Sequence, residues 1–291
     1  MKKRYMMYIV IAIICILAIG IGVYYQLDHD RPERQETTNE IDIEPEPVSN
    51  SEDMEAVLKE FNSLLTNTFY DQGNDTTAVN RLAGHEEQEI VYAAYNIKEE
   101  KDGKYNVNIN LPAININGDV VAEFNNTTNK VFSNKVAEVI KTNNKYTIYN
   151  IEYVAYLNDN ILSVVIKSTL KEEGNAERVR VQTYNYDIEA EKEVTLNDIL
   201  EQKQITQKSV NKKIEKQVKE AARKAEAVAG EYASQGKLVY ERDVNNAMYI
   251  TDYVNDFFLG KDGQIYIVYA YGNTNHTAEM DVIKVDENVK Q

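Results

Sequence analysis

"KYTIYNIEYVAYLNDNILSVVIKSTL", residues 145–170, carries the clearest structural pattern in the chain. Apolar and polar side chains alternate through residues 145–157, which is the period of a β-strand with one buried face. Asn158-Asp159-Asn160 is typical of a tight turn, and a second strand-like run follows at residues 161–170. A third strand is predicted for residues 177–188, so this part of the chain predicts an antiparallel meander. The residues expected on the buried face of the first two strands are Tyr149, Ile151, Tyr153, Ala155, Leu157, Leu162, Val164 and Ile166.

Three amphipathic helices are predicted on either side of this meander. Apolar residues recur every three or four positions in residues 118–141, which is the spacing of one helix face. The same spacing predicts a helix from Glu52 to about Tyr70 and a long, Lys-rich helix over residues 196–231.

Further strands are predicted before and after these helices. Lys101-Asp102-Gly103 lies between two strand-like runs at residues 89–98 and 104–111, which predicts a hairpin whose second strand ends at Pro112. Residues 264–271 (QIYIVYAY) form the most strand-like run of all. Because short turns join most strands, we expect an α+β fold with a mainly antiparallel sheet and long amphipathic helices, preceded by one transmembrane helix.

The transmembrane helix is predicted for residues 6–25, where every side chain is apolar, small or aromatic. About 20 such residues are needed to cross a hydrocarbon layer of ~30 Å. Lys2, Lys3 and Arg4 precede the run, so the positive-inside rule leaves the N-terminus cytoplasmic and the C-terminal domain extracellular, in a single-pass protein of the cell membrane. A cleaved signal peptide is the alternative interpretation.

We predict five segments along the chain. The tether is assigned from its many charges and few apolar residues. The segments are a cytoplasmic N-terminus with the membrane anchor (1–27), a disordered acidic tether (28–51), a helix with a connecting region (52–100), a first α+β subdomain (101–188) and a second α+β subdomain (189–291).

The charge balance restricts the class of partner. Asp and Glu number 47 against 32 Lys and Arg, so the formal net charge is -15. Such a protein repels nucleic acid and attracts basic partners. The single cysteine, Cys15, lies inside the apolar run, so we expect neither disulfides nor thiolate chemistry outside the membrane.

Four carboxylates alternate in residues 187–193: Asp187, Glu189, Glu191 and Glu193. A calcium loop also needs a sharp Gly turn and a closing bidentate residue, and this stretch has neither. Thr195 can cap a following helix with Asp198 at its third position, so the strand must turn between these points. We therefore predict a solvated turn rather than a cation site.

No motif for catalysis is recognisable, and we expect no enzyme, no metal and no cofactor. His85 lacks the second His of a helical zinc motif, and neither a phosphate loop nor a nucleophile elbow occurs. The alternative is a cell-envelope enzyme that uses His276, Glu279 and Asp281.

Tyrosine is unusually common, with 21 Tyr against 6 Phe and no Trp. Tyr combines apolar area with a hydrogen-bonding tip, which favours binding surfaces, although it is also a good strand residue. Tyr269 and Tyr271 share a strand face that leads into a polar loop, and loops at strand ends collect binding groups. We therefore predict a binding surface at Tyr269, Tyr271, Asn273 and His276, with a purely structural role as the alternative.

Four stretches together resemble the paired extracytoplasmic domains of unknown function found in the anti-sigma-V factor, a lysozyme receptor, and appended to certain peptidoglycan deacetylases. The likeness covers about residues 105–285, and family proteins often carry Gly-Lys where this chain has Glu191-Lys192. The stretches are "INLPAININGDVVAEFN" (109–125), "ILSVVI" (161–166), "YNYDIEAEKEVTLNDIL" (184–200) and "FFLGKDGQIYIVYAYGNTNHTAEMD" (257–281).

The resemblance implies a binding or sensing module alone. Only Met1 to about Tyr5 precede the apolar run, too few to hold a sigma factor, and no deacetylase domain is recognisable. We therefore expect a membrane-anchored extracytoplasmic module for a lysozyme-like basic protein or a cell-wall component such as peptidoglycan, with no nucleic acid as partner.

Overall fold

The computed structural model describes residues 54–141, 145–235, 239–272 and 277–285. The predicted anchor and tether, and with them Asn273 and His276, lie outside the described residues. Within the described ranges, no helix is long and apolar enough to span a membrane.

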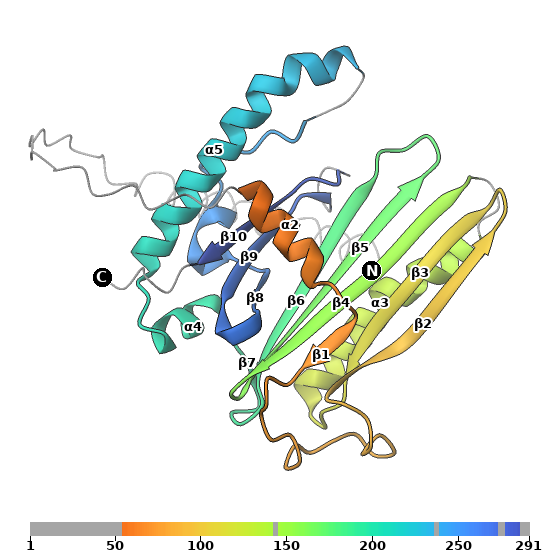
Figure 1. The fold of residues 1–291 in the computed structure, drawn as a ribbon, viewed down its shortest axis with the longest axis vertical. Helices are drawn as coiled ribbons and strands as arrows, with labels where there is room; N and C mark the ends of the chain where they lie inside the picture. Colours follow the sequence, from red (N-terminus) through yellow and green to blue (C-terminus); the bar gives the residue numbers. More distant parts are fainter. Residues whose placement is uncertain (1–53, 142–144, 236–238, 273–276, 286–291) are drawn as a thin grey trace, which may run out of the picture. The chain divides into compact units, whose positions relative to one another are not determined.

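A seven-stranded sheet is the largest element of the described part (Figure 1). Its strands are β1 (Thr68–Tyr70), β2 (Val91–Lys101), β3 (Tyr105–Ile114), β4 (Thr147–Asn158), β5 (Ile161–Glu172), β6 (Arg178–Asp187) and β7 (Lys192–Glu193).

The strands follow the order β2-β3-β4-β5-β6-β7, and β1 pairs with β4 beyond the end of β3. The hairpins β2–β3, β4–β5 and β5–β6 are antiparallel, as predicted. β3 and β4 run parallel, and the long helix α3 (Asp119–Lys141) between them provides the crossover connection that a parallel pair requires. The α+β class with a mainly antiparallel sheet is confirmed.

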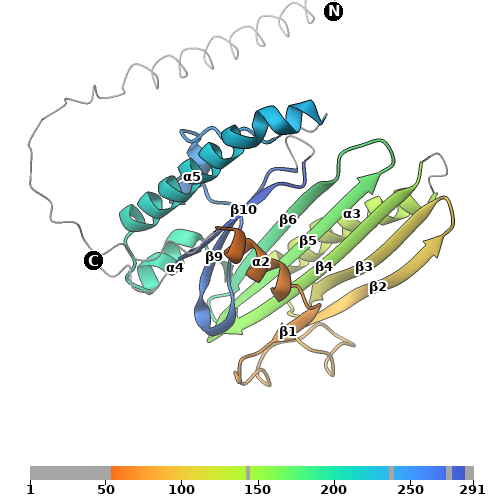
Figure 2. The ribbon, with the colours of Figure 1, turned by 45° about the horizontal axis from the view of Figure 1, so that its top comes forward.

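Each face of the large sheet has its own core. α3 covers one face with the side chains that its 3.6-residue period predicts, and the alternating residues of β4 and β5 meet it there. α2 (Met54–Leu64) and a second sheet cover the other face (Figure 2). Val154, Tyr156 and Val165 of the large sheet pack in that second core.

The second sheet has three antiparallel strands in the order β10-β9-β8. Its outer face packs against two helices, and its inner face packs against the large sheet. The predicted boundary after residue 188 falls in the turn before β7 and stays a prediction. The elements of this half are α4 (Leu196–Gln202), α5 (Gln207–Ser234), the short 3-10 helices η1 (Ala247–Tyr249), η2 (Thr251–Tyr253) and η3 (Lys261–Gly263), and the strands β8 (Phe257–Leu259), β9 (Ile265–Ala270) and β10 (Met280–Val285).

Three predicted element boundaries were wrong. The helix predicted to reach Tyr70 ends at Leu64, because residues 68–70 pair with β4 as the strand β1. The helix predicted over residues 196–231 is two helices, since Gln204 has a φ of 57° and Thr206 caps the start of α5. β3 continues past Pro112 to Ile114, because the partner strand β2 has a register shift opposite this proline.

Candidate functional site

The alternating carboxylates form the predicted solvated turn. Glu189, Glu191 and Glu193 are exposed, and Asp187 Oδ1 accepts hydrogen bonds from the amides of Glu189 and Ala190. The helix that follows begins with a capping box between Thr195 and Asp198, as predicted. No group of three or more His, Cys, Asp or Glu side chains that could hold a metal ion occurs in the described part of the chain.

The predicted binding residues Tyr269 and Tyr271 are buried, at 4% and 1% exposed, in the core between the second sheet and α5. They share this face with Ile265 and Ile267, as the alternation predicts. The Tyr271 hydroxyl donates to Asp281 Oδ2 at 2.6 Å and lies 2.9 Å from the Tyr249 hydroxyl. Their contacts are therefore with the chain itself, and a role in binding stays a prediction.

Glu279 and Asp281, named for the enzyme alternative, are both engaged by Arg242. The guanidinium makes two hydrogen bonds to Asp281, 2.7 Å from Nε and 2.8 Å from Nη2, and Nη1 lies 3.4 Å from Glu279. The other Glu279 oxygen accepts from the amide of Tyr240 at 2.6 Å, and the Tyr240 ring stacks on Tyr271 at 3.9 Å. We call Tyr240, Arg242, Tyr249, Tyr271, Glu279 and Asp281 the Arg242 cluster.

Burial dominates the electrostatics of the Arg242 cluster. Burial raises the pKa of Tyr249 to about 12, and burial together with the Asp281 charge raises the pKa of Tyr271 above its usual range. Burial opposes the charge of Arg242, but the hydrogen bonds to Asp281 and the charges of Asp281, Tyr271 and Glu279 together outweigh it and raise the pKa of the guanidinium. The guanidinium of Arg242 and the hydroxyls of Tyr249 and Tyr271 therefore keep their protons near neutral pH.

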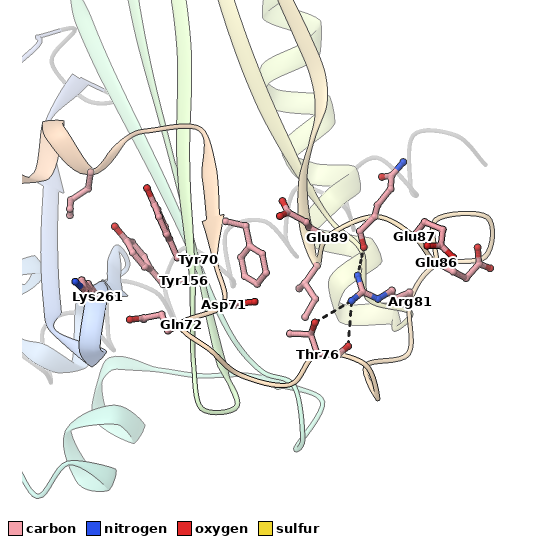
Figure 3. A pocket seen from close by; sticks show the side chains of 14 residues that line it. Tyr70, Asp71, Gln72, Thr76, Arg81, Glu86, Glu87, Glu89, Tyr156 and Lys261 are labelled. Carbon is pink, nitrogen blue, oxygen red and sulfur yellow. Dashed lines mark hydrogen bonds between the residues drawn. The ribbon is translucent and has the colours of Figure 1, made fainter.

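A second charged site is a pocket lined by β1 and the loop of residues 71–90 (Figure 3). It encloses about 870 Å³ and we call it the acidic pocket. It is lined by Leu64, Phe69, Tyr70, Asp71, Gln72, Thr76, Arg81, Glu86, Glu87, Gln88, Glu89, Ile90, Tyr156 and Lys261.

The loop that forms this pocket is held in place by a buried asparagine. Asn115 is 0% exposed, and its Nδ2 lies within hydrogen-bonding distance of the carbonyls of His85 (2.8 Å), Gln88 (3.3 Å) and Glu89 (3.4 Å). Its Oδ1 accepts from the amide of Leu82 at 3.1 Å. A long loop without regular structure is usually functional, and this one is pre-organised.

Arg81, which belongs to this loop, also holds the loop together by hydrogen bonds to other loop residues. Arg81 donates to the carbonyl of Gln88 and to the carbonyl and hydroxyl oxygens of Thr76, the last two at 3.4 and 3.3 Å. Figure 3 shows these bonds on the side of the pocket away from Tyr70. The Arg81 guanidinium is thus hydrogen-bonded to the wall of the pocket.

Four carboxylates line the pocket: Asp71, Glu86, Glu87 and Glu89, all exposed. Across the described residues, none of the four forms an ion pair. A hydrogen bond from the amide of Gly84 lowers the pKa of Glu86. The four carboxylates are therefore exposed, without an ion pair in the described part of the chain, and accessible to a cation.

An aromatic pair completes the pocket. Tyr70 and Tyr156 are directly opposed in the β1–β4 pairing, and their rings stack at 5.3 Å with an angle of 16°. Tyr156 is 4% exposed, whereas Tyr70 is 40% exposed. Burial raises the pKa of Tyr156 to about 12.

Sequence reasoning missed the acidic pocket. The residues between 71 and 90 show neither helical nor strand periodicity, and Tyr156 lies far away in the chain. The cluster of Glu86, Glu87 and Glu89 within so long an irregular segment was the available signal.

Comparison with known proteins finds likeness in three dimensions only. The sequence matches no protein family profile and no curated protein. Its fold is similar to a DUF3298 family protein from Pseudomonas aeruginosa PAO1 (11% identity, 65% of this chain and 85% of that chain, TM-score 0.37). It is also similar to a DUF3298 family member from Bacteroides fragilis (16% identity, 63% and 82%, TM-score 0.32). These neighbours belong to a family of unknown function, and at TM-scores below 0.5 neither likeness carries a function over to this chain.

Proposed function

We propose that this protein is a membrane-anchored extracytoplasmic binding or sensing module whose ligand is a basic, lysozyme-like protein. The observation that carries the proposal is the acidic pocket, where four exposed carboxylates without ion pairs in the described residues surround a cavity. Opposite charges across an interface speed encounter and select partners. The formal net charge of -15 acts in the same direction at longer range.

The anchor and the class of ligand come from the sequence. The apolar run of residues 6–25 supports a single membrane helix with the domain outside the cell. The resemblance to the extracytoplasmic domains of the anti-sigma-V factor supports a lysozyme-like partner. A cell-wall glycan is the second candidate ligand, because the exposed Tyr70 ring can pack against a sugar face.

We propose binding rather than catalysis. Glu279 and Asp281 would have to act as acid, base or ligand in the enzyme alternative, and both are bonded to Arg242. A carboxylate held in this way is poorly placed to exchange protons with a substrate.

The experiment compares two sets of substitutions in the full chain, purified in detergent. Glu86, Glu87 and Glu89 are replaced together by Gln, and the control replaces the exposed turn residues Glu189, Glu191 and Glu193 by Gln. We expect the first variant to bind lysozyme about ten-fold more weakly at low salt, because three charges facing the partner are removed. We expect wild-type affinity for the control.

Three outcomes contradict the proposal in different ways. Equal weakening by both variants would assign the effect to overall charge rather than to the pocket. No lysozyme binding by the wild-type chain, together with retention on insoluble peptidoglycan, would favour the cell-wall ligand. Loss of activity on an envelope substrate after His276→Ala would favour the enzyme.

A further inference from the structure

We propose that the second half of α5 is a homodimer surface, on which α5 of a second copy of this chain packs antiparallel. The surface is the row of Ala221, Ala225, Val228 and Tyr232, which recur at helical spacing, and we call it the α5 stripe. This inference goes beyond the proposed function and does not depend on which ligand the acidic pocket binds.

The α5 stripe continues an apolar helix face that the protomer itself uses. Val210, Ile214 and Val218 of this face are buried in the core between α5 and the second sheet. The spacing of three and four residues then runs on unbroken through the α5 stripe. All buried residues of α5 precede Ala221, and Tyr232 is 39% exposed. Figure 1 shows this half of α5 extending past the strands of the second sheet.

The α5 stripe is one wall of a groove that encloses about 1170 Å³. Met54 and Leu58 of α2 and Met280 of β10 also line the groove, so three elements contribute apolar side chains to it. Arg242 and Asp281 border it as well, but they are paired with each other. A groove with such a lining is a usual docking site for the apolar face of an amphipathic helix.

The charges of α5 favour a second α5 as the helix that docks here. Residues 207–224 contain seven Lys or Arg and two Glu, whereas residues 225–234 contain two Glu and no Lys or Arg. In an antiparallel pair, the basic part of each α5 lies beside the acidic end of the other, and in a parallel pair like charges lie together. The helix is therefore complementary in charge to a copy of itself that runs in the opposite direction.

The side chains of the α5 stripe also match in this arrangement. When Ala225 faces Val228 of the second copy, Ala221 faces Tyr232 of the second copy, because the two chains run in opposite directions. Each layer then sets a small side chain against a larger one, which allows the two helices to approach closely and fill the space between them.

Lys224 and Glu231 flank the α5 stripe and come to the same level in the antiparallel pair. Positions that flank an apolar seam in this way form salt bridges between helices. The twofold symmetry gives two such pairs, from Lys224 of each copy to Glu231 of the other. Within the protomer Lys224 lies 3.6 Å from Glu220, in an exposed pair of the kind that contributes little to stability.

The test measures the monomer–dimer equilibrium of the full chain by sedimentation in density-matched detergent. We expect a dimer for the wild type. Val228→Asp should weaken the dimer by more than about ten-fold, because it places a carboxylate in the apolar seam.

A charge exchange identifies the contact itself. Lys224→Glu and Glu231→Lys should each weaken the dimer by about ten-fold, because both symmetric pairs become repulsive. The double variant Lys224→Glu with Glu231→Lys should restore most of the affinity. The matched control is Arg223→Glu, which makes the same change of charge one residue away, at an exposed position off the stripe. We expect wild-type affinity for this control.

Four results would overturn the inference. The first is a chain that stays monomeric at every concentration, and the second is a dimer that the Val228 and charge variants leave unchanged. The third is equal weakening by Arg223→Glu, which would assign the effect to overall charge. The fourth is a monomer whose binding of lysozyme falls after Val228→Asp, because the groove would then belong to that partner. Thermal unfolding checks that every variant keeps its fold.

Discussion

The Arg242 cluster and the acidic pocket contain the same kinds of side chain but differ in whether the carboxylates are buried and paired. In the Arg242 cluster the carboxylate of Asp281 is 5% exposed and makes two hydrogen bonds to a guanidinium that is 7% exposed. In the acidic pocket the carboxylates are exposed and make no ion pair within the described residues. Both sites also contain a stacked pair of tyrosines.

The difference is one of desolvation. A charge removed from water must find its partner within the fold, and the pair then becomes part of the architecture. A charge left in water costs the fold nothing and remains available to a partner. Of the two sites, the acidic pocket is therefore the one suited to binding.

The largest effect is expected for Asp281→Ala, which leaves the buried Arg242 without its main partner. Removing one member of a buried ion pair costs about 3–5 kcal/mol in unfolding free energy. Chemical denaturation measures this loss. The double variant Arg242→Met with Asp281→Leu should recover most of the lost stability, because no buried charge is then left unpaired. If the double variant is as unstable as Asp281→Ala, the unpaired charge is not the cause of the loss, and the ion pair itself stabilises the fold.

Asp256 is an intermediate case, because it is desolvated and accepts hydrogen bonds from the amide and hydroxyl of Thr183 rather than from a cation. Burial raises its pKa to about 6, although the bonds from Thr183 act in the opposite direction. The unfolded value is about 3.9, so the folded state binds the proton more tightly. The stabilisation that protonated Asp256 gives to the folded state is fully present below about pH 4 and is lost as the pH rises through about 6.

The Asp256→Asn variant should therefore gain stability relative to the wild type as the pH rises. We expect the difference in unfolding free energy between variant and wild type to grow by up to about 3 kcal/mol between pH 4 and pH 7.5. Denaturation at a series of pH values tests this. A difference independent of pH would mean that Asp256 is not desolvated as the structure indicates.

Asn115→Ala tests whether the loop of the acidic pocket is pre-organised. The change leaves the amide of Leu82 and several loop carbonyls without their partner, at a cost of about 1–3 kcal/mol. Affinity for lysozyme should also fall, because the loop must then be ordered on binding. Hydrogen exchange at Leu82 would report the loosening, and unchanged exchange would show that the loop does not depend on Asn115.

The smallest effect on stability is expected for Glu86, Glu87 and Glu89 replaced together by Gln. These side chains are exposed and without ion pairs in the described part, so thermal unfolding should stay close to that of the wild type. A marked loss of stability would mean that the pocket carboxylates are structural, which would remove the contrast with the Arg242 cluster.

Much of the fold could be predicted because its signals are local. The alternation in β4 and β5, the turn at Asp159 with a φ of 51°, and the periodicity of α3 are all contained in neighbouring residues. The capping box at Thr195 is likewise read within four positions. Such elements can therefore be predicted without knowing which residues pack against them.

The candidate site could not be predicted in the same way. Its tyrosine pair forms because β1 adds to β4, and its loop is held by Asn115, which follows the hairpin. The predicted binding residues were chosen from their position at a strand end, and the structure places Tyr269 and Tyr271 in a core instead of on a surface. A strand-end tyrosine has the same sequence pattern in either environment.

The sequence by itself determined the α+β class, the meander, the helix that covers it and the acidic charge, because periodicity, turn chemistry and composition are properties of short segments. Only the tertiary structure decided which charges are paired. Arg242 forms an ion pair with Asp281, which lies far from it in the chain, while the glutamates of the 71–90 loop pair with no cation in the described part. The stacking of Tyr70 on Tyr156 likewise joins residues that are far apart in the chain. Pairing depends on distance and desolvation in space, and these are set when the sheets and the loop come together.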